Sequence, residues 1–133
     1  MSASDFFDTN VLLYLASPDT DKAERAEAIL KPQGWISVQV LNEFTSVAMR
    51  KFHMSLEETR DFLSGIREIV EILPLHAHTH DQAVAIAARH RLNIYDAMIV
   101  AAASEAGCDT LYTEDLQDGM RIEGLTVRNP FTP

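Results

Sequence analysis

Short strand-like runs alternate with helix-like runs along the chain, and this alternation restricts the fold more than any other feature of the sequence. The expected strands cover residues 5–8, 35–37, 70–75, 110–113 and 125–128. The expected helices cover residues 11–15, 18–30, 38–52, 55–69, 79–91 and 96–106. Strands joined through helices pair in parallel. We therefore predict a three-layer α/β/α sandwich on a mainly parallel, Rossmann-like sheet.

Local signals support several of these boundaries. Ser55 and Glu58 have the spacing of a capping box, and Pro74 marks an edge or an end of a strand. Residues 96–106 are almost wholly apolar, so this helix must be buried, and Gly107 suits the position after its last turn.

The length and composition of the chain suit one soluble domain. With 133 residues, 47% of them apolar, the chain can form a full hydrophobic core, and we expect a single domain, residues 1–133. The apolar stretch near the N-terminus is interrupted by Asp8 and Asn10, which predicts neither a signal peptide nor a membrane span. The single cysteine, Cys108, agrees with a reducing compartment, and we expect a cytoplasmic protein.

Four carboxylates stand at element boundaries or among residues that favour burial: Asp8, Glu43, Asp96 and Asp115. Asp8 and Asp115 follow expected strands, and the carboxyl ends of parallel strands border the crevice in which α/β sheets bind ligands. Asp96 begins the apolar helix, and Glu43 lies on the side of its own helix that faces the core. We therefore expect all four carboxylates to converge in one crevice.

Converging carboxylates repel one another, and a bound hard cation relieves that repulsion while all of them stay ionised. Ligands that are all oxygen favour Mg²⁺ or Mn²⁺, which leave coordination positions open for water and phosphate. The pattern therefore indicates metal-assisted hydrolysis of a phosphodiester.

Four segments around these acids resemble the acidic motifs of PIN-domain nucleases, and specifically of VapC-type toxins of bacterial toxin–antitoxin pairs: FFDTNVLLY, LNEF, YDAMIVAAA and LYTEDLQDG. The resemblance runs from about Phe6 to Val127. It implies that the four acids bind metal, that Thr113 is the hydroxyl of the site and that Asp118 is a further acid near the metal. It also implies Mg²⁺-dependent endoribonuclease activity, a homodimer, and an antitoxin whose tail lies across the active site.

Each of these residues also has a purely structural interpretation. Asp8 and Asp96 suit helix caps, and Asp115 and Asp118 suit turns. Glu43 is harder to explain in this way, because a glutamate on an apolar helix stripe needs a partner.

Two polar residues beside the acids have open roles. Asn10 contacts the scissile phosphate or a metal-bound water, or it caps the first short helix. Thr113 orients Asp115 or the water, or it merely ends a strand. The sequence alone does not choose between these interpretations.

Twenty acidic residues against eleven basic ones give a net charge of −9, which argues against broad binding to a polyanion. The negative charge suits a basic antitoxin segment better, with an arginine pairing into the acid cluster. Basic residues gather at Arg50–Lys51 and Arg89–Arg91, each closing a helix. These two pairs hold phosphates only if both face the acids.

The alternating His76, His78 and His80 raise a zinc hypothesis. Thr79 and Gln82 indicate a helix start at this point, which would break the shared face that an extended run gives to the three histidines. A catalytic role for Cys108 is not indicated, because no base lies nearby in the sequence.

Other functions remain as alternatives. An aspartyl-phosphate phosphatase would need a second acid two residues after the nucleophile, where this chain has Asn10. A noncatalytic module that binds metal or protein is separated from a nuclease by an assay with and without EDTA. A housekeeping RNA-processing nuclease is a further alternative to a toxin.

Overall fold

The computed structural model describes residues 4–132. In chain order its elements are β1 (Asp5–Phe7), α1 (Thr9–Leu15), α2 (Thr20–Ile29), β2 (Trp35–Ser37), α3 (Val38–Lys51), α4 (Leu56–Arg67), β3 (Glu71–Leu73), α5 (Ala77–His90), α6 (Ile94–Glu105), β4 (Thr110–Tyr112), β5 (Arg121–Ile122) and β6 (Leu125–Arg128). Every element expected from the sequence is present, with its boundaries within two residues of those expected.

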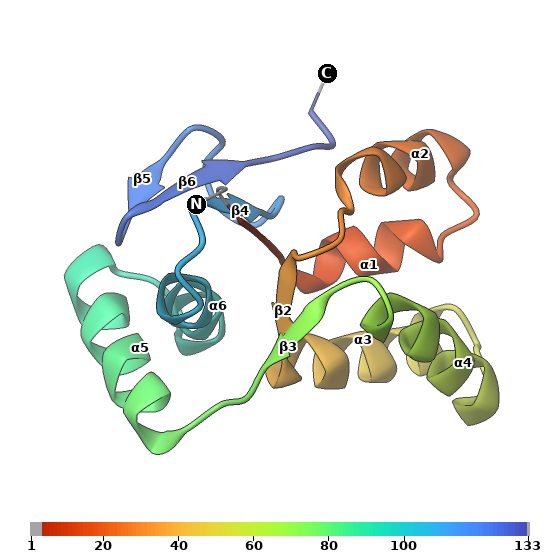
Figure 1. The fold of residues 1–133 in the computed structure, drawn as a ribbon, viewed down its shortest axis with the longest axis horizontal. Helices are drawn as coiled ribbons and strands as arrows, with labels where there is room; N and C mark the ends of the chain where they lie inside the picture. The colour runs from red at the N-terminus through yellow and green to blue at the C-terminus, as the bar shows by residue number, and fades with distance from the viewer. Residues whose placement is uncertain (1–3, 133) are drawn as a thin grey trace.

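The strands form one sheet in the order β3-β2-β1-β4-β6-β5. All neighbouring strands pair in parallel except β5 and β6, which are antiparallel. Figure 1 shows α5 and α6 on one side of the sheet and α1 to α4 on the other. The prediction of an α/β/α sandwich with a mainly parallel sheet is confirmed.

The chain reverses its course across the sheet between two neighbouring strands, β1 and β4. From β1 it moves outward to β2 and β3, and it then returns through α5 and α6 to β4 on the other side of β1. Such a reversal leaves a crevice beyond the carboxyl ends of the two strands. Phe7 lies in register with Tyr112, so Asp8 and Thr113 leave the sheet side by side.

Two local features differ from the expectation. The strand β5 is additional, and it joins β6 through the two-residue turn Glu123–Gly124, with φ of 48° and 82°. Positive φ at both positions is what a tight hairpin of this kind requires. The helix α6 begins at Ile94 with Asn93 as its N-cap, so the interpretation of Asp96 as the cap is wrong.

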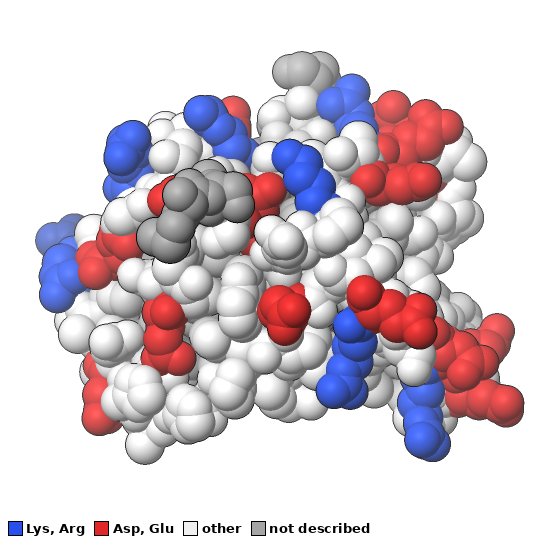
Figure 2. Space-filling view, viewed as in Figure 1, with Lys and Arg blue, Asp and Glu red and all other residues white. Residues whose placement is uncertain are grey.

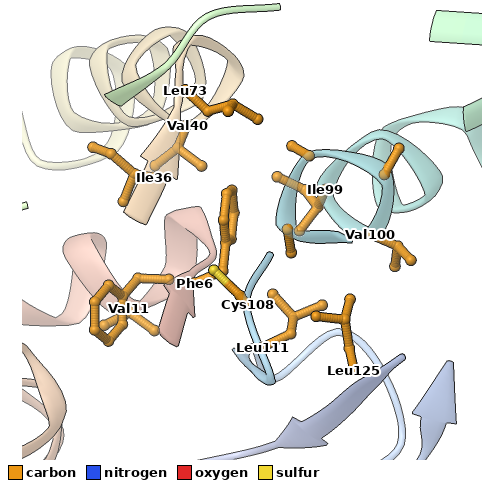
Figure 3. Close-up of a cluster of buried hydrophobic side chains, with 14 of the residues drawn as sticks. Phe6, Val11, Ile36, Val40, Leu73, Ile99, Val100, Cys108, Leu111 and Leu125 are labelled. Carbon is orange, nitrogen blue, oxygen red and sulfur yellow. The ribbon is translucent and has the colours of Figure 1, made fainter. Parts of the chain in front are cut away.

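The apolar helix α6 lies in the core, as expected. Its residues Ala97 and 99–103 are buried. Figure 3 shows Ile99 and Val100 of this helix among the apolar side chains of the strands. The helix has 12 residues, and within residues 4–132 no helix is both long and apolar enough to cross a membrane.

Gly34 precedes β2 in a tightly packed place, and we expect Gly34→Ala to destabilise the fold. A Cβ at this position would lie 2.3 Å from Cε2 of Phe7, a fully buried ring that stacks on Tyr112. Overpacking of this kind costs about 1–3 kcal/mol. Urea unfolding measures the change in the free energy of unfolding.

Gly65 provides a control of opposite sign. It lies in α4, and a Cβ there would meet nothing within 4 Å. Gly65→Ala should therefore stabilise the protein by about 0.5–1 kcal/mol, because alanine is the better helix former. Equal effects of the two substitutions would contradict the packing at Gly34.

Candidate active site

Asp8 joins the end of β1 to the start of α1 and is buried, with 5% of its surface exposed. Its Oδ1 accepts a hydrogen bond from the Thr9 backbone N–H at 2.6 Å, and its Oδ2 accepts one from the Thr113 hydroxyl at 2.7 Å. Burial raises the pKa of Asp8 to about 7; these hydrogen bonds oppose the rise, and the charges of Asp115 and Glu43 add to it. The ionised form of Asp8 is therefore costly without a cation.

Thr113 connects the residues that follow β1 with those that follow β4. Its hydroxyl donates to Asp8, and it accepts from the Asp115 backbone N–H at 3.0 Å and from Asn10 Nδ2 at 3.3 Å. Asn10 Nδ2 also donates to Asp115 Oδ2 at 3.2 Å. Four residues from two separate segments thus share one hydrogen-bond network at the switch point of the sheet.

Asn10 lies inside α1, which begins at Thr9 and is capped by Asp8. The interpretation of Asn10 as the cap of this helix is therefore wrong. Its side-chain Oδ1 is buried and has no hydrogen-bond partner among the described residues. A buried acceptor without a donor is costly, so this oxygen faces a place where a further donor or a cation would be favourable.

Glu43 reaches the same network from α3. Its Oε1 accepts from the Thr9 hydroxyl and from Gln39 Nε2, each at 3.1 Å. Gln39 Nε2 also donates to the backbone carbonyl of Tyr95 at 3.2 Å, which links α3 to the start of α6. The glutamate is half-buried, and these two donors hold its carboxylate beside Asp8.

Asp96 is the third residue of α6 and is half-buried. Its backbone N–H donates to Asn93 Oδ1 at 2.9 Å, and its Oδ2 accepts from Asn93 Nδ2 at 2.8 Å. Burial raises the pKa of Asp96, and the charges of Asp115 and Glu43 raise it further. Asp96 therefore faces the same group of acids, although it is bonded to none of them.

The four acids repel one another, and no basic side chain of the described residues forms an ion pair with them. The ion pairs of the described residues use other acids: Asp21, Asp81, Glu105 and Glu123. As placed, no three His, Cys, Asp or Glu side chains within residues 4–132 stand close enough to hold a metal ion. The donor set nevertheless fits a hard cation, because it is all oxygen, mutually repelling, and bordered by the unpaired Asn10 Oδ1. Ligation would require the carboxylates to close inward.

The site is open rather than enclosed. Asp115 is exposed, and Glu43 and Asp96 are half-buried, so a long polymer can reach the acids. A cavity of about 720 Å³ lies elsewhere, around Asp5 and Trp35 at the opposite ends of the strands. An open acidic surface at the switch point suits a polymer substrate better than a small molecule, which binds in a concave pocket.

Asp118 is not joined to the acid network by any hydrogen bond in the described part of the chain. Its Oδ1 accepts from the Asn129 backbone N–H at 2.9 Å, which holds the turn before β5. The structure thus gives Asp118 a clear structural contact, as the interpretation of this residue as a turn former predicts.

The basic segment at Arg89 and the histidine-rich segment make other contacts. Arg89 and His90 both contact Glu123 Oε2, at 2.7 and 2.9 Å, and so fasten α5 to the β5–β6 turn. The helix α5 begins at Ala77, so the histidine run is not extended, as expected. His78 instead contacts Glu105 Oε1 at 2.9 Å.

Sequence reasoning missed two residues of the network, Thr9 and Gln39. Thr9 follows Asp8 directly, and its hydroxyl crosses to α3. Gln39 lies four residues before Glu43, which is the spacing of side chains that meet on a helix surface. That spacing was a usable signal, whereas the contact of Thr9 depends on how α1 and α3 pack.

The fold and the site together define a class: a Rossmann-like α/β domain with an acidic site at the switch point of its parallel sheet. Residues 6–117 match the PIN domain, and the chain belongs to the PIN-domain family. Comparison with curated protein sequences gives no match.

Solved structures of toxin–antitoxin proteins share this fold. A chain in a toxin–antitoxin complex from Klebsiella pneumoniae is 27% identical, with a TM-score of 0.73 over 98% of both chains. VapBC2 from Rickettsia felis, bound to a DNA fragment from its promoter, gives 19% identity and a TM-score of 0.70 over 95% of this chain and 98% of that one. Mycobacterium tuberculosis VapC20, a sarcin–ricin loop cleaving toxin, gives 22% identity and a TM-score of 0.67 over 84% of this chain and 91% of that one. The last two likenesses establish the fold alone.

Proposed function

We propose that the protein is a Mg²⁺-dependent endoribonuclease that acts in the cytoplasm as the toxin of a toxin–antitoxin pair. The observation that carries the proposal is the group of four acids, Asp8, Glu43, Asp96 and Asp115, which repel one another and have no basic partner among the described residues. Membership of the PIN-domain family supports the nuclease activity. The likeness to a chain of the Klebsiella pneumoniae toxin–antitoxin complex supports the toxin role.

In this proposal the four acids hold Mg²⁺, with Mn²⁺ as a substitute. A bound ion of this kind supplies an activated water and neutralises charge on the phosphodiester. Thr113 fixes the Asp8 carboxylate and the Asp115 backbone, and Thr9 with Gln39 fixes the Glu43 carboxylate. Neutral donors of this type orient the acids without competing for their charge.

Asn10 and Asp118 take different roles in the proposal. Asn10 holds Asp115 through Nδ2, and its unpaired Oδ1 is available to accept a hydrogen bond from a water at the site. Asp118 is assigned to the turn that it already bonds rather than to the metal.

An antitoxin with a basic tail is the proposed protein partner. The net charge of −9 and the unpaired acids of the site are complementary to such a tail. Figure 2 shows acidic residues gathered over α2 and α4, while basic residues are scattered singly over the same face.

We also propose that the protein forms a homodimer. Exposed apolar side chains such as Met49 and Val84 support this proposal. Light scattering that gives a monomer mass at high micromolar concentration would contradict it.

Removing the metal tests the proposed activity. The purified protein should cleave bacterial total RNA in Mg²⁺, lose the activity in EDTA, and regain it when excess Mg²⁺ or Mn²⁺ is added. Without a cation the four carboxylates repel the phosphates of the RNA instead of binding them. Gel electrophoresis of the RNA measures the result.

The contrary outcomes point to the alternatives. RNA left intact under all of these conditions would indicate a noncatalytic module. Cleavage without arrest of growth when the protein is expressed in a bacterial host would indicate a housekeeping nuclease instead of a toxin.

A further inference from the structure

Tyr95 is an exposed aromatic residue at the edge of the acid cluster. It precedes Asp96 in α6, and 67% of its surface is exposed, more than for any other large apolar side chain in the described residues. Exposed large apolar side chains occur elsewhere, as at Leu56 in α4, but those are not next to a candidate metal ligand. An exposed aromatic ring beside a catalytic site suggests contact with a substrate.

The backbone that carries Tyr95 is held firmly. Gln39 Nε2 donates both to the Tyr95 carbonyl and to Glu43 Oε1, so the position of Tyr95 is tied to that of a candidate ligand. Asn93 caps the helix two residues before Tyr95, and the neighbouring Ile94 packs against the core. A side chain on a fixed backbone loses less conformational entropy when it binds a ligand than one on a mobile segment.

The other two tyrosines are already engaged inside the fold. Tyr14 donates to Glu114 and packs against Phe131, and Tyr112 stacks on Phe7. Their rings lie half-buried, whereas that of Tyr95 faces solvent. Tyr95 is therefore the tyrosine with a free face for a ligand.

The charge of the chain favours a base over a phosphate as the group that Tyr95 binds. A protein with a net charge of −9 gains little affinity for RNA from its phosphates. Stacking between an aromatic ring and an unpaired base provides affinity that does not depend on charge. Bases in a duplex already stack on their neighbours, so only an unpaired base offers its face.

We propose that Tyr95 is a stacking platform for an unpaired nucleobase of the RNA beside the cleaved phosphodiester. This inference rests on the proposed ribonuclease function and adds a substrate-contacting residue to it. The ring contacts a base and takes no part in proton transfer.

A single-stranded oligoribonucleotide that carries one 2-aminopurine tests the proposal. Ca²⁺ replaces Mg²⁺ as a hard cation, and the fluorescence of 2-aminopurine falls when this base stacks on a ring. We expect quenching with the wild type and with Tyr95→Phe, and its loss with Tyr95→Leu, which keeps an apolar side chain but removes the ring. Affinity for the oligomer should fall at least about fivefold in Tyr95→Leu, the low end of what one base stack contributes. Leu56→Ala, a matched exposed apolar change in α4, should leave both readings unchanged.

The outcomes separate this inference from the proposed function. If Tyr95→Leu binds, quenches and cleaves like the wild type, the stacking role is overturned while the nuclease stands. If Tyr95→Leu keeps its RNA affinity but changes from dimer to monomer in light scattering, Tyr95 is a contact between subunits and the inference is also overturned. If the wild type cleaves no RNA in Mg²⁺, the proposed function fails, and binding in Ca²⁺ still decides whether Tyr95 stacks on a base.

Discussion

Asp96→Asn is expected to lower RNA cleavage at least about 100-fold while leaving the metal-free protein as stable as the wild type or more so. Losing a residue that only supports a metal ligand lowers metal affinity or activity about 10- to 100-fold. The loss of a ligand itself should reach the upper end of that range or exceed it. The asparagine keeps an oxygen that can accept the hydrogen bond from Asn93. It removes a carboxyl group whose pKa is raised by burial and by the charges of Asp115 and Glu43.

A structural carboxylate would behave in the opposite way. Removing its charge would leave a partner unsatisfied and lower the melting temperature of the metal-free protein. The measurement is thermal unfolding in EDTA together with cleavage in Mg²⁺. Asp81→Asn is the matched control, because Asp81 is an exposed acid of α5 outside the network. Marked destabilisation in EDTA with cleavage retained would refute the assignment of Asp96 to the metal.

The fold was largely predictable because its information is local. Capping signals and apolar runs mark the elements, as at Ser55 with Glu58 and in the apolar residues of α6. The alternation of strands and helices then leaves few arrangements apart from a parallel sheet. The strand β5 was not predicted because its turn has Glu123 at a positive φ, where asparagine or aspartate is the usual sequence signal.

The positions of the candidate acids relative to the strands were predictable, but the contacts between them were not. The position of Asp8 after β1 and of Asp115 beyond β4 follows from the alternation and from where the strands end. The order of β1 and β4 in the sheet brings Asp8 beside Thr113, and sequence periodicity carries no information about that order. The bond from Thr9 to Glu43 likewise depends on the packing of α1 against α3.

Asp8 should make the metal-free protein less stable as the pH rises from about 4 to about 7. Burial raises the pKa of Asp8 in the folded protein from 3.8 to about 7. Between these values the folded chain keeps a proton that the unfolded chain has lost, so stability falls with rising pH and levels off above the folded pKa. The loss between pH 5 and pH 8 is about 3 kcal/mol from this group.

Urea unfolding in EDTA at pH 5 and pH 8 measures this loss, and the difference between the wild type and Asp8→Asn isolates it. The comparison is needed because burial also raises the pKa of Asp5, while hydrogen bonds lower that of Glu123, and these groups titrate in both proteins. Mg²⁺ should restore the stability of the wild type at pH 8, because a cation favours the ionised carboxylate, and it should do so less in Asp8→Asn. Equal pH dependence in the two proteins would mean that Asp8 ionises freely in the folded protein, and its burial beside the other acids would then leave no cost of ionisation for a cation to relieve.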